Sequence, residues 1–153
     1  MRRILMLALV ILAAPTAAQQ PAVEALTVVQ RLFDAMRAKD SLAIAATFDT
    51  SGSLLVLVQR DGREFLSHMS GVEFARRIAG IPAGTEIEER IWDAETRVDG
   101  NLATVWTPYA FLINGVVSHC GVDAVMLMRF ADGWKIVAIA DTRRTQGCEV
   151  PAG

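Results

Sequence analysis

Three glycine-containing turns divide the second half of the chain into long segments with few other breaks. They are Asp99-Gly100, Asn114-Gly115 and Asp132-Gly133. Glycine after Asn or Asp favours the tight turns that join neighbouring antiparallel strands. The segments between these turns are rich in Val, Ile, Thr and aromatic residues, which favours strands over residues 85–98, 101–113, 116–130 and 134–143. This half of the chain therefore predicts an antiparallel meander.

The segment before the meander has helical spacing of its apolar residues, broken by one extended stretch. We expect helices over residues 23–39, 41–48 and 70–79, and extended segments over 54–58 and 63–69. Asp40 is placed to cap the second helix, and Ser70 with Glu73 forms a capping box at the start of the third. Helices followed by a meander predict an α+β fold, with the helices packed on one face of an antiparallel sheet.

The N-terminus has the three parts of a secretory signal. Arg2 and Arg3 precede the apolar run Ile4–Ala14, and small residues up to Ala18 offer a cleavage site. A membrane-spanning helix needs about 20 apolar residues, so this run is too short for a permanent anchor. We expect a cleaved signal over 1–18, one domain over 19–153, and a periplasmic or secreted protein without a stable membrane anchor.

Charge and motif content exclude several classes of function. The net charge is −2, and removal of the two signal arginines makes it more negative. The longest basic runs are Arg76-Arg77 and Arg143-Arg144, which argues against a nucleic-acid surface. No metal-ligand spacing and no Gly-rich phosphate loop occur in the sequence, so we expect no metal and no cofactor.

The chain has two cysteines, Cys120 and Cys148. In an oxidising compartment such a pair is a candidate disulfide. The alternatives are two free buried thiols, or a reactive Cys120 thiol beside His119.

Strand alternation predicts which residues meet the helices. The turns pair Val98 with Asn101, Ile113 with Val116 and, through a three-residue loop, Phe130 with Trp134. The face expected under the helices carries Ala94, Val98, Ala103, Val105, Ala124, Met126, Met128, Phe130, Trp134, Ile136, Ala138 and Ala140. Its far end, where we expect a pocket, carries Arg90, Trp92, Thr107, Tyr109, Phe111, Cys120, Val122, Thr142 and Arg144.

The opposite face is expected to hold a row of Asp93, Trp106, Asp123 and Asp141. We interpret this row as a partly solvated outer face, or as the surface of a homodimer around Trp106. The alternative is a metal or acid–base cluster. A bulge at Pro108, which cannot donate to a ladder, would exchange the two faces beyond it and turn His119 inward.

Several motifs resemble those of the nuclear transport factor 2-like superfamily. They are the order of the elements, the Lys39-Asp40 step and the closing Asp132-Gly133-Trp134-Lys135-Ile136. Trp106-Thr107-Pro108-Tyr109, Ser118-His119-Cys120-Gly121-Val122-Asp123 and the late Arg143-Arg144 with Cys148 resemble an exported bacterial branch, whose members are labelled as proposed lumazine-binding or nuclear transport factor 2 family proteins. The resemblance implies a cone-shaped α+β fold, which hosts enzymes, ligand carriers and dimerisation modules.

The site patterns of enzymes with this fold match only in part. Ketosteroid isomerase-like chemistry needs an Asp base with Tyr and protonated Asp donors, and no Asp is expected beside Tyr109. Scytalone dehydratase-like chemistry uses residue types that His119, Asp123 and Tyr109 supply. Asp93, Arg97 and Asp123 imitate the Asp–Arg–Asp set of limonene epoxide hydrolases, but on the face expected to point outward.

The leading prediction is a module that binds a small, partly apolar molecule. Its expected ligand-binding residues are Trp92, Thr107, Tyr109, Val122, Arg90 and Arg144, with an arginine for an anionic or carbonyl group. The first alternative is a lyase, isomerase or hydrolase that uses His119 or Asp123 with Tyr109. The second is a dimeric interaction module.

Overall fold

The computed structural model describes residues 19–151, so the predicted signal peptide lies outside the described residues. In this part of the chain the helices are α1 (Gln20–Ala38), α2 (Ser41–Thr47) and α3 (Gly71–Ala79). The strands are β1 (Phe48–Arg60), β2 (Arg63–Ser70), β3 (Ile87–Ile91), β4 (Glu95–Asp99), β5 (Leu102–Ile113), β6 (Val116–Phe130) and β7 (Gly133–Asp141). No helix among the described residues is long and apolar enough to cross a membrane.

The helices begin where the sequence predicts. The Asp40 carboxylate accepts hydrogen bonds of 3.0 Å from the backbone N–H groups of Leu42 and Ala43 at the start of α2. Ser70 Oγ accepts one from the Glu73 N–H at 3.2 Å, which is half of the predicted capping box. The Glu73 carboxylate makes an ion pair with Arg77 instead, at 2.7 Å.

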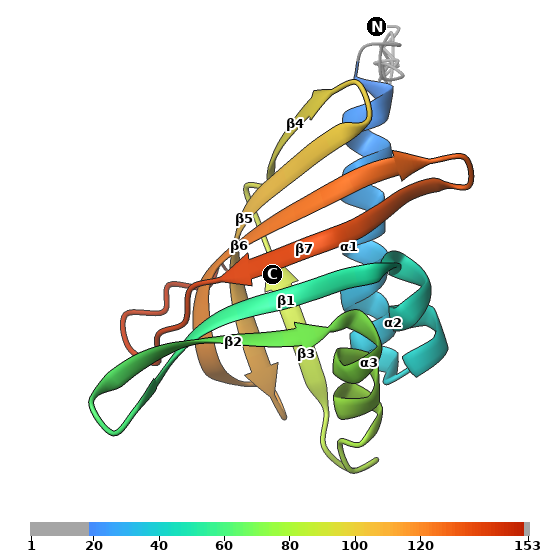
Figure 1. The fold of residues 1–153 in the computed structure, drawn as a ribbon. Coiled ribbons are helices and arrows are strands. Elements are labelled where there is room, and N and C mark those ends of the chain that lie inside the picture. Colours follow the sequence, from blue (N-terminus) through green and yellow to red (C-terminus); the bar gives the residue numbers. More distant parts are fainter. Residues whose placement is uncertain (1–18, 152–153) are drawn as a thin grey trace, which may run out of the picture.

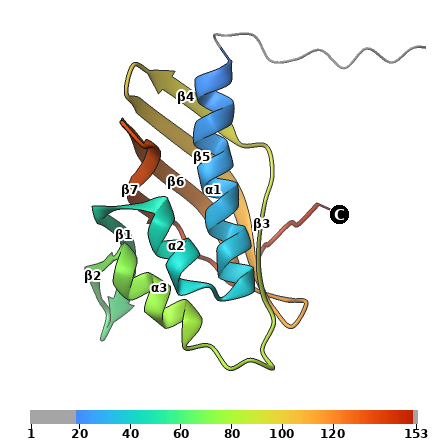
Figure 2. The ribbon, with the colours of Figure 1, turned by 90° about the vertical axis from the view of Figure 1, so that its right-hand side faces the viewer.

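The strands form one curved sheet in the order β2-β1-β7-β6-β5-β3, and β4 also pairs with β5 (Figure 1). The prediction of a purely antiparallel sheet fails for one pair of strands, because β1 runs parallel to β7. Helices α1 and α2 precede β1, α3 joins β2 to β3, and all three lie against one side of the sheet (Figure 2). We call that side the inner face and the opposite side the outer face.

The strand predicted over 85–98 is two strands. Between β3 and β4 the chain breaks at Asp93, whose φ of 46° is left-handed. The break adds one residue, so Ile91 lies opposite Tyr109 and Glu95 lies opposite Trp106. Because side chains alternate, this turns Glu89 to the inner face and Arg90 to the outer face, opposite to the prediction.

A bulge in β6 overturns the prediction for that strand. Ile113 pairs with Val116 as expected, but Phe111 pairs with His119, which leaves Ser118 as an extra residue. His119 and Asp123 therefore lie on the inner face. The apolar residues predicted to face the helices, Met126, Met128 and Phe130, are 44%, 37% and 43% exposed.

The last hairpin differs in the same way. Phe130 pairs with Gly133 rather than with Trp134, so the loop is one residue shorter than predicted. A second bulge at Val137 then exchanges the faces again. Trp134 and Ile136 are buried as expected, but Asp141 turns inward and Ala140 is exposed.

The core lies between α1 and the inner face. Its fully buried members include Val29 and Leu32 of α1, Val105 of β5, Leu127 of β6 and Ile136 of β7. Apolar residues at helical spacing on α1 meet apolar residues at every second position of the strands, which is the packing that a one-sided sheet requires.

The C-terminal segment is fastened to β6. Cys120 and Cys148 form the predicted disulfide, across a sequence separation of 28 residues. The backbones of Cys120 and Arg144 exchange two hydrogen bonds of 2.9 Å. Cys148 and Val150 pack with Trp92 on a small second core. The disulfide is consistent with an oxidising compartment.

Candidate functional site

A cavity of about 290 Å³ opens between the helices and the inner face. We call it the inner cavity. Most of its wall is apolar: Leu32, Phe33, Met36, Leu54, Val56, Met69, Phe74, Ile78, Ile81, Phe111 and Ile139. The polar lining residues are Ser67, Arg77, Glu89, Tyr109, His119, Asp123, Asp141 and Arg143. A mainly apolar cavity with a few convergent polar groups is the usual form of a small-molecule site.

Three carboxyl groups, from Glu89, Asp123 and Asp141, line this cavity from three strands. Asp123 of β6 lies directly opposite Asp141 of β7. Glu89 reaches the same place from β3, and its carboxyl group lies within hydrogen-bonding reach of Asp123. The break at Asp93 and the bulges at Ser118 and Val137 bring all three to one side of the sheet.

Burial and mutual repulsion raise the pKa values of two of these groups. Burial, followed by the charge of Asp141, raises the pKa of Asp123 from 3.8 to about 7. Burial, followed by the charge of Asp123, holds the pKa of Glu89 well above its ordinary value. In its protonated form, the Glu89 carboxyl group can donate a hydrogen bond to the Asp123 carboxylate. The raised pKa of Asp123 leaves both protonation states of that group populated near neutral pH.

Asp123 is 4% exposed. Its Oδ2 atom is buried and receives no hydrogen bond from any N–H or hydroxyl group of the described residues. The acid proton of Glu89 is thus the hydrogen that this carboxylate can share. A buried carboxylate with so few donors is a strong base and costs free energy when it is ionised.

Tyr109 closes the polar end of the cavity and is 2% exposed. Its hydroxyl lies 3.1 Å from both Asp141 Oδ2 and the Thr142 carbonyl oxygen, and it can donate to one of them at a time. Burial, with the charge of Asp141, raises the pKa of Tyr109, so the hydroxyl stays protonated. Arg143 makes an ion pair of 3.3 Å with the same Asp141 oxygen.

The His119 ring stacks on Phe111, with ring centroids 5.1 Å apart, and meets the Tyr109 ring edge-on at 5.9 Å. Burial, followed by the nearby charge of Arg143, lowers the pKa of His119. His119 is therefore a neutral aromatic wall at neutral pH, with Nδ1 3.2 Å from Ser118 Oγ.

The arrangement suits acid–base chemistry. Two carboxyl groups whose pKa values lie above the ordinary range, one of them near neutrality, can take and give protons at physiological pH. Among the described residues, no group of three or more His, Cys, Asp or Glu side chains is placed to hold a metal ion.

The structure brings together the three residues predicted for the enzyme alternative, since His119, Asp123 and Tyr109 all line the inner cavity. The other predicted ligand-binding residues do not line it: Trp92, Thr107, Val122, Arg90 and Arg144. Thr107 is buried and donates to the Trp92 carbonyl oxygen at 3.0 Å, and Arg90 pairs with Glu88 at 2.9 Å. Arg144 is exposed.

Sequence reasoning missed Glu89 and Arg143, and it placed Asp123 and Asp141 on the wrong face. Glu89 lies in a run of charged residues, Glu88-Glu89-Arg90, where any of the three is an equal candidate. The apolar residues on either side of this run, Ile87 and Ile91, share the inner face with Glu89 and were the available signal.

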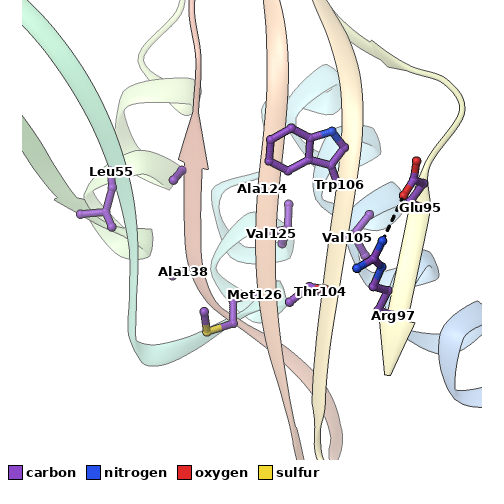
Figure 3. Close-up of a pocket in the computed structure, with 11 residues that line it drawn as sticks. Leu55, Glu95, Arg97, Thr104, Val105, Trp106, Ala124, Val125, Met126 and Ala138 are labelled. Carbon is purple, nitrogen blue, oxygen red and sulfur yellow. Dashed lines mark ion pairs between the residues drawn. The ribbon is translucent and has the colours of Figure 1, made fainter. Parts of the chain in front are cut away.

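A larger, shallower hollow of about 600 Å³ lies on the outer face. Its wall includes Leu55, Trp106 and Met126, with the Glu95–Arg97 ion pair of 3.8 Å at one side (Figure 3). Both charged side chains are largely exposed. This outer hollow lacks a buried titratable group, so the chemistry that the structure supports lies in the inner cavity.

No protein-family model matches the sequence. No curated protein matches it either. Solved structures do match. A proposed dehydratase of the nuclear transport factor 2-like family from Streptomyces avermitilis has 19% identity and a TM-score of 0.63, over 82% of this chain and 96% of that one.

Two further solved structures match this chain in fold. A nuclear transport factor 2-like protein of unknown function from Silicibacter pomeroyi has 20% identity and a TM-score of 0.60, over 85% of this chain and all of that one. One with a cystatin-like fold from Novosphingobium aromaticivorans has 15% identity and a TM-score of 0.65, over 81% and 82%. The chain therefore has the α+β nuclear transport factor 2-like fold, as its sequence motifs predicted.

Proposed function

We propose that this protein is an acid–base enzyme, an isomerase or lyase, which moves a proton on a small, mostly apolar molecule in the inner cavity. The observation that carries the proposal is the Asp123 carboxyl group, buried in a mainly apolar cavity next to the Glu89 carboxyl group, whose pKa burial raises well above its ordinary value. The fold supports small-molecule binding and isomerase-like roles. The Streptomyces avermitilis protein named a proposed dehydratase is a relative in fold with a related reaction class.

Asp123 is suited to be the general base. Its pKa of about 7 leaves a substantial ionised fraction at neutral pH, and the ionised form is poorly solvated. A base whose pKa lies near the working pH combines the right protonation state with a strong pull on the proton. The apolar wall excludes water, which would otherwise weaken that pull.

Glu89 is suited to be the general acid. In the resting site its proton is held by the Asp123 carboxylate. When Asp123 takes a proton from a substrate carbon, the C–H electron pair moves into the substrate and Asp123 becomes neutral. Glu89 can then give its proton to the substrate oxygen that receives negative charge, either a carbonyl oxygen or a departing hydroxyl.

Tyr109 and Arg143 are positioning residues in this scheme. The Tyr109 hydroxyl donates to Asp141 or to the Thr142 carbonyl oxygen, so its proton is not directed at a ligand. Arg143 pairs with the same carboxylate. Together they hold Asp141 in the place from which its charge raises the pKa of Asp123.

The rival function is binding without reaction, which was the leading prediction from sequence. A carrier of a neutral molecule gains nothing from ionisable groups in its cavity, and a buried carboxylate lowers stability unless it is used. The acid pair therefore favours catalysis. Export to the periplasm or outside the cell remains part of the proposal, and the Cys120–Cys148 disulfide supports it.

The test uses 5-nitrobenzisoxazole, a flat bicyclic probe. A base removes the C–H proton of its isoxazole ring while the N–O bond breaks, and the product is a coloured cyanonitrophenolate. We expect the purified protein to turn the probe over, with a rate that rises with pH through about 7 as Asp123 ionises. Asp123→Asn should lower kcat/KM by about 100-fold, as for loss of a general base.

The matched control is Asp99→Asn, which makes the same change of charge at an exposed position beside the β4–β5 turn. Its kcat/KM should equal that of the wild type. Turnover that survives Asp123→Asn, or no turnover above that of free carboxylate buffer, would contradict the proposed function.

A further inference from the structure

The inner cavity has more buried negative charge than positive charge. Among the described residues that line it, the arginines are Arg77 and Arg143. Arg77 is bonded to Glu73 at 2.7 Å, and Arg143 to Asp141 at 3.3 Å. Both arginine side chains are more than half exposed, so much of their charge is screened by water. Among the described residues, neither arginine makes an ion pair with Asp123, although the charge of Arg143 acts on it from a distance.

The atom that lacks a partner is Oδ2 of Asp123. Asp123 is 4% exposed, and its Oδ2 atom has no N–H or hydroxyl donor among the described residues. An ionised carboxylate in such a place gains most from a ligand that brings both a hydrogen-bond donor and a positive charge.

The surroundings of this carboxylate also suit a cation. Phe111 and His119 stack on each other, and Tyr109 meets the His119 ring edge-on. All three line the same cavity as Asp123. Aromatic faces attract ammonium groups, and the attraction is stronger where water is excluded. The neutral state of His119, whose pKa burial lowers, keeps this wall free of positive charge at neutral pH.

We propose that the inner cavity binds hydrophobic primary amines in their protonated form, with the ammonium group on Asp123 and the apolar body against the wall formed by α1 and α3. Helix α1 supplies Leu32, Phe33 and Met36 to that wall, and α3 supplies Phe74 and Ile78. Carboxylates of the same shape are excluded, because they would meet Asp123 and Asp141 at close range in a medium of low dielectric.

This inference rests on the proposed function in one respect, since both need Asp123 ionised within the cavity. It differs in what it requires of the ligand. An amine that pairs with Asp123 blocks the base, so such amines act as competitive inhibitors of proton transfer, and an amine substrate would have to present its C–H bond to a different group.

The test compares three probes with one body: 2-phenylethylamine, 2-phenylethanol and phenylacetate. Isothermal titration calorimetry at pH 8 keeps the amine protonated and Asp123 ionised. We expect the amine to bind about tenfold more tightly than the alcohol, and phenylacetate to bind more weakly than both.

Asp123→Asn should bring the affinity for the amine down to that for the alcohol and leave the affinity for the alcohol unchanged. Retained alcohol binding shows that the variant cavity is intact. Asp99→Asn, the exposed control, should keep the full preference for the amine. Equal binding of amine and alcohol by the wild type, tightest binding of phenylacetate, or no detectable binding of the amine would overturn the inference.

The two proposals fail separately. Base-catalysed turnover of 5-nitrobenzisoxazole without a preference for the amine would remove the inference and leave the proposed function. A preference for the amine that depends on Asp123, in a protein that does not turn the probe over, would remove the proposed function and leave a carrier of amines.

Discussion

At the scale of single residues, the account depends on two carboxyl groups that share one proton. Glu89 and Asp123 lie side by side in a cavity whose wall is mostly apolar, and Asp141 adds a further negative charge. Carboxyl groups this close together in an apolar place cannot all be ionised at once. The pKa values of Glu89 and Asp123 are therefore both raised. These raised values supply an acid and a base at neutral pH.

The raised pKa of Asp123 predicts how stability depends on pH. The folded protein holds a proton up to about pH 7 that the unfolded chain releases near pH 3.8. Folding is therefore favoured by this group below pH 3.8, and the advantage is lost as the pH rises through 7. Between pH 5 and pH 8 the group should cost the wild type about 3 kcal/mol of unfolding free energy.

Asp123→Asn removes this titration. We expect the variant to gain stability relative to the wild type as the pH rises from 5 to 8, by about the same 3 kcal/mol. Urea unfolding at the two pH values measures the change, and Asp99→Asn provides the control for an exposed carboxylate. A constant difference between Asp123→Asn and the wild type would show that Asp123 has an ordinary pKa.

At the scale of elements, the fold was predictable and the faces of the strands were not. The helix boundaries, the Asp40 cap and the turn signals gave each helix and most strands within a few residues. Repeated alternation, however, carries any one-residue error along the whole strand. The unpredicted bulges at Ser118 and Val137 caused such errors. Nothing in a Val-Val-Ser-His or Ile-Val-Ala-Ile run distinguishes a bulge from a regular strand.

The alternative that the sequence left open, a bulge at Pro108 in β5, does not occur, because Pro108 pairs regularly with Val122. The irregularity lies in the neighbouring strand instead. The alternative prediction that His119 turns inward is therefore correct, but its stated cause is wrong. Farther along β6, Gly121 pairs regularly with Tyr109, and the Thr142 carbonyl group approaches its backbone so closely that a side chain would not fit.

The disulfide also acts at this scale, because it fastens the segment after β7 to β6. Cys148→Ser opens a cross-link between residues 28 positions apart, which should lower the unfolding free energy by about 3 kcal/mol. Chemical denaturation without reductant measures this loss. Reductant should destabilise the wild type by a similar amount and leave Cys148→Ser unchanged; an equal effect of reductant on both would contradict the prediction.

At the scale of the whole molecule, the two sides of the sheet have different uses. The inner face, with the helices, encloses the cavity and its acid pair. The outer face exposes Trp106, 55% accessible, beside a hollow of about 600 Å³. The homodimer predicted from the sequence stays a prediction, and this face is the surface where it would form.

The most direct test of the account is the pKa of Asp123 in the folded protein. Carbon-13 labelling of the aspartate side-chain carboxyl groups, with Asp123→Asn to assign the signal, allows its titration to be followed by NMR. The account predicts a midpoint near pH 7 for Asp123. A midpoint near 4, as for an exposed aspartate, would show that the carboxylate is well solvated and would remove the basis for both catalysis and amine binding.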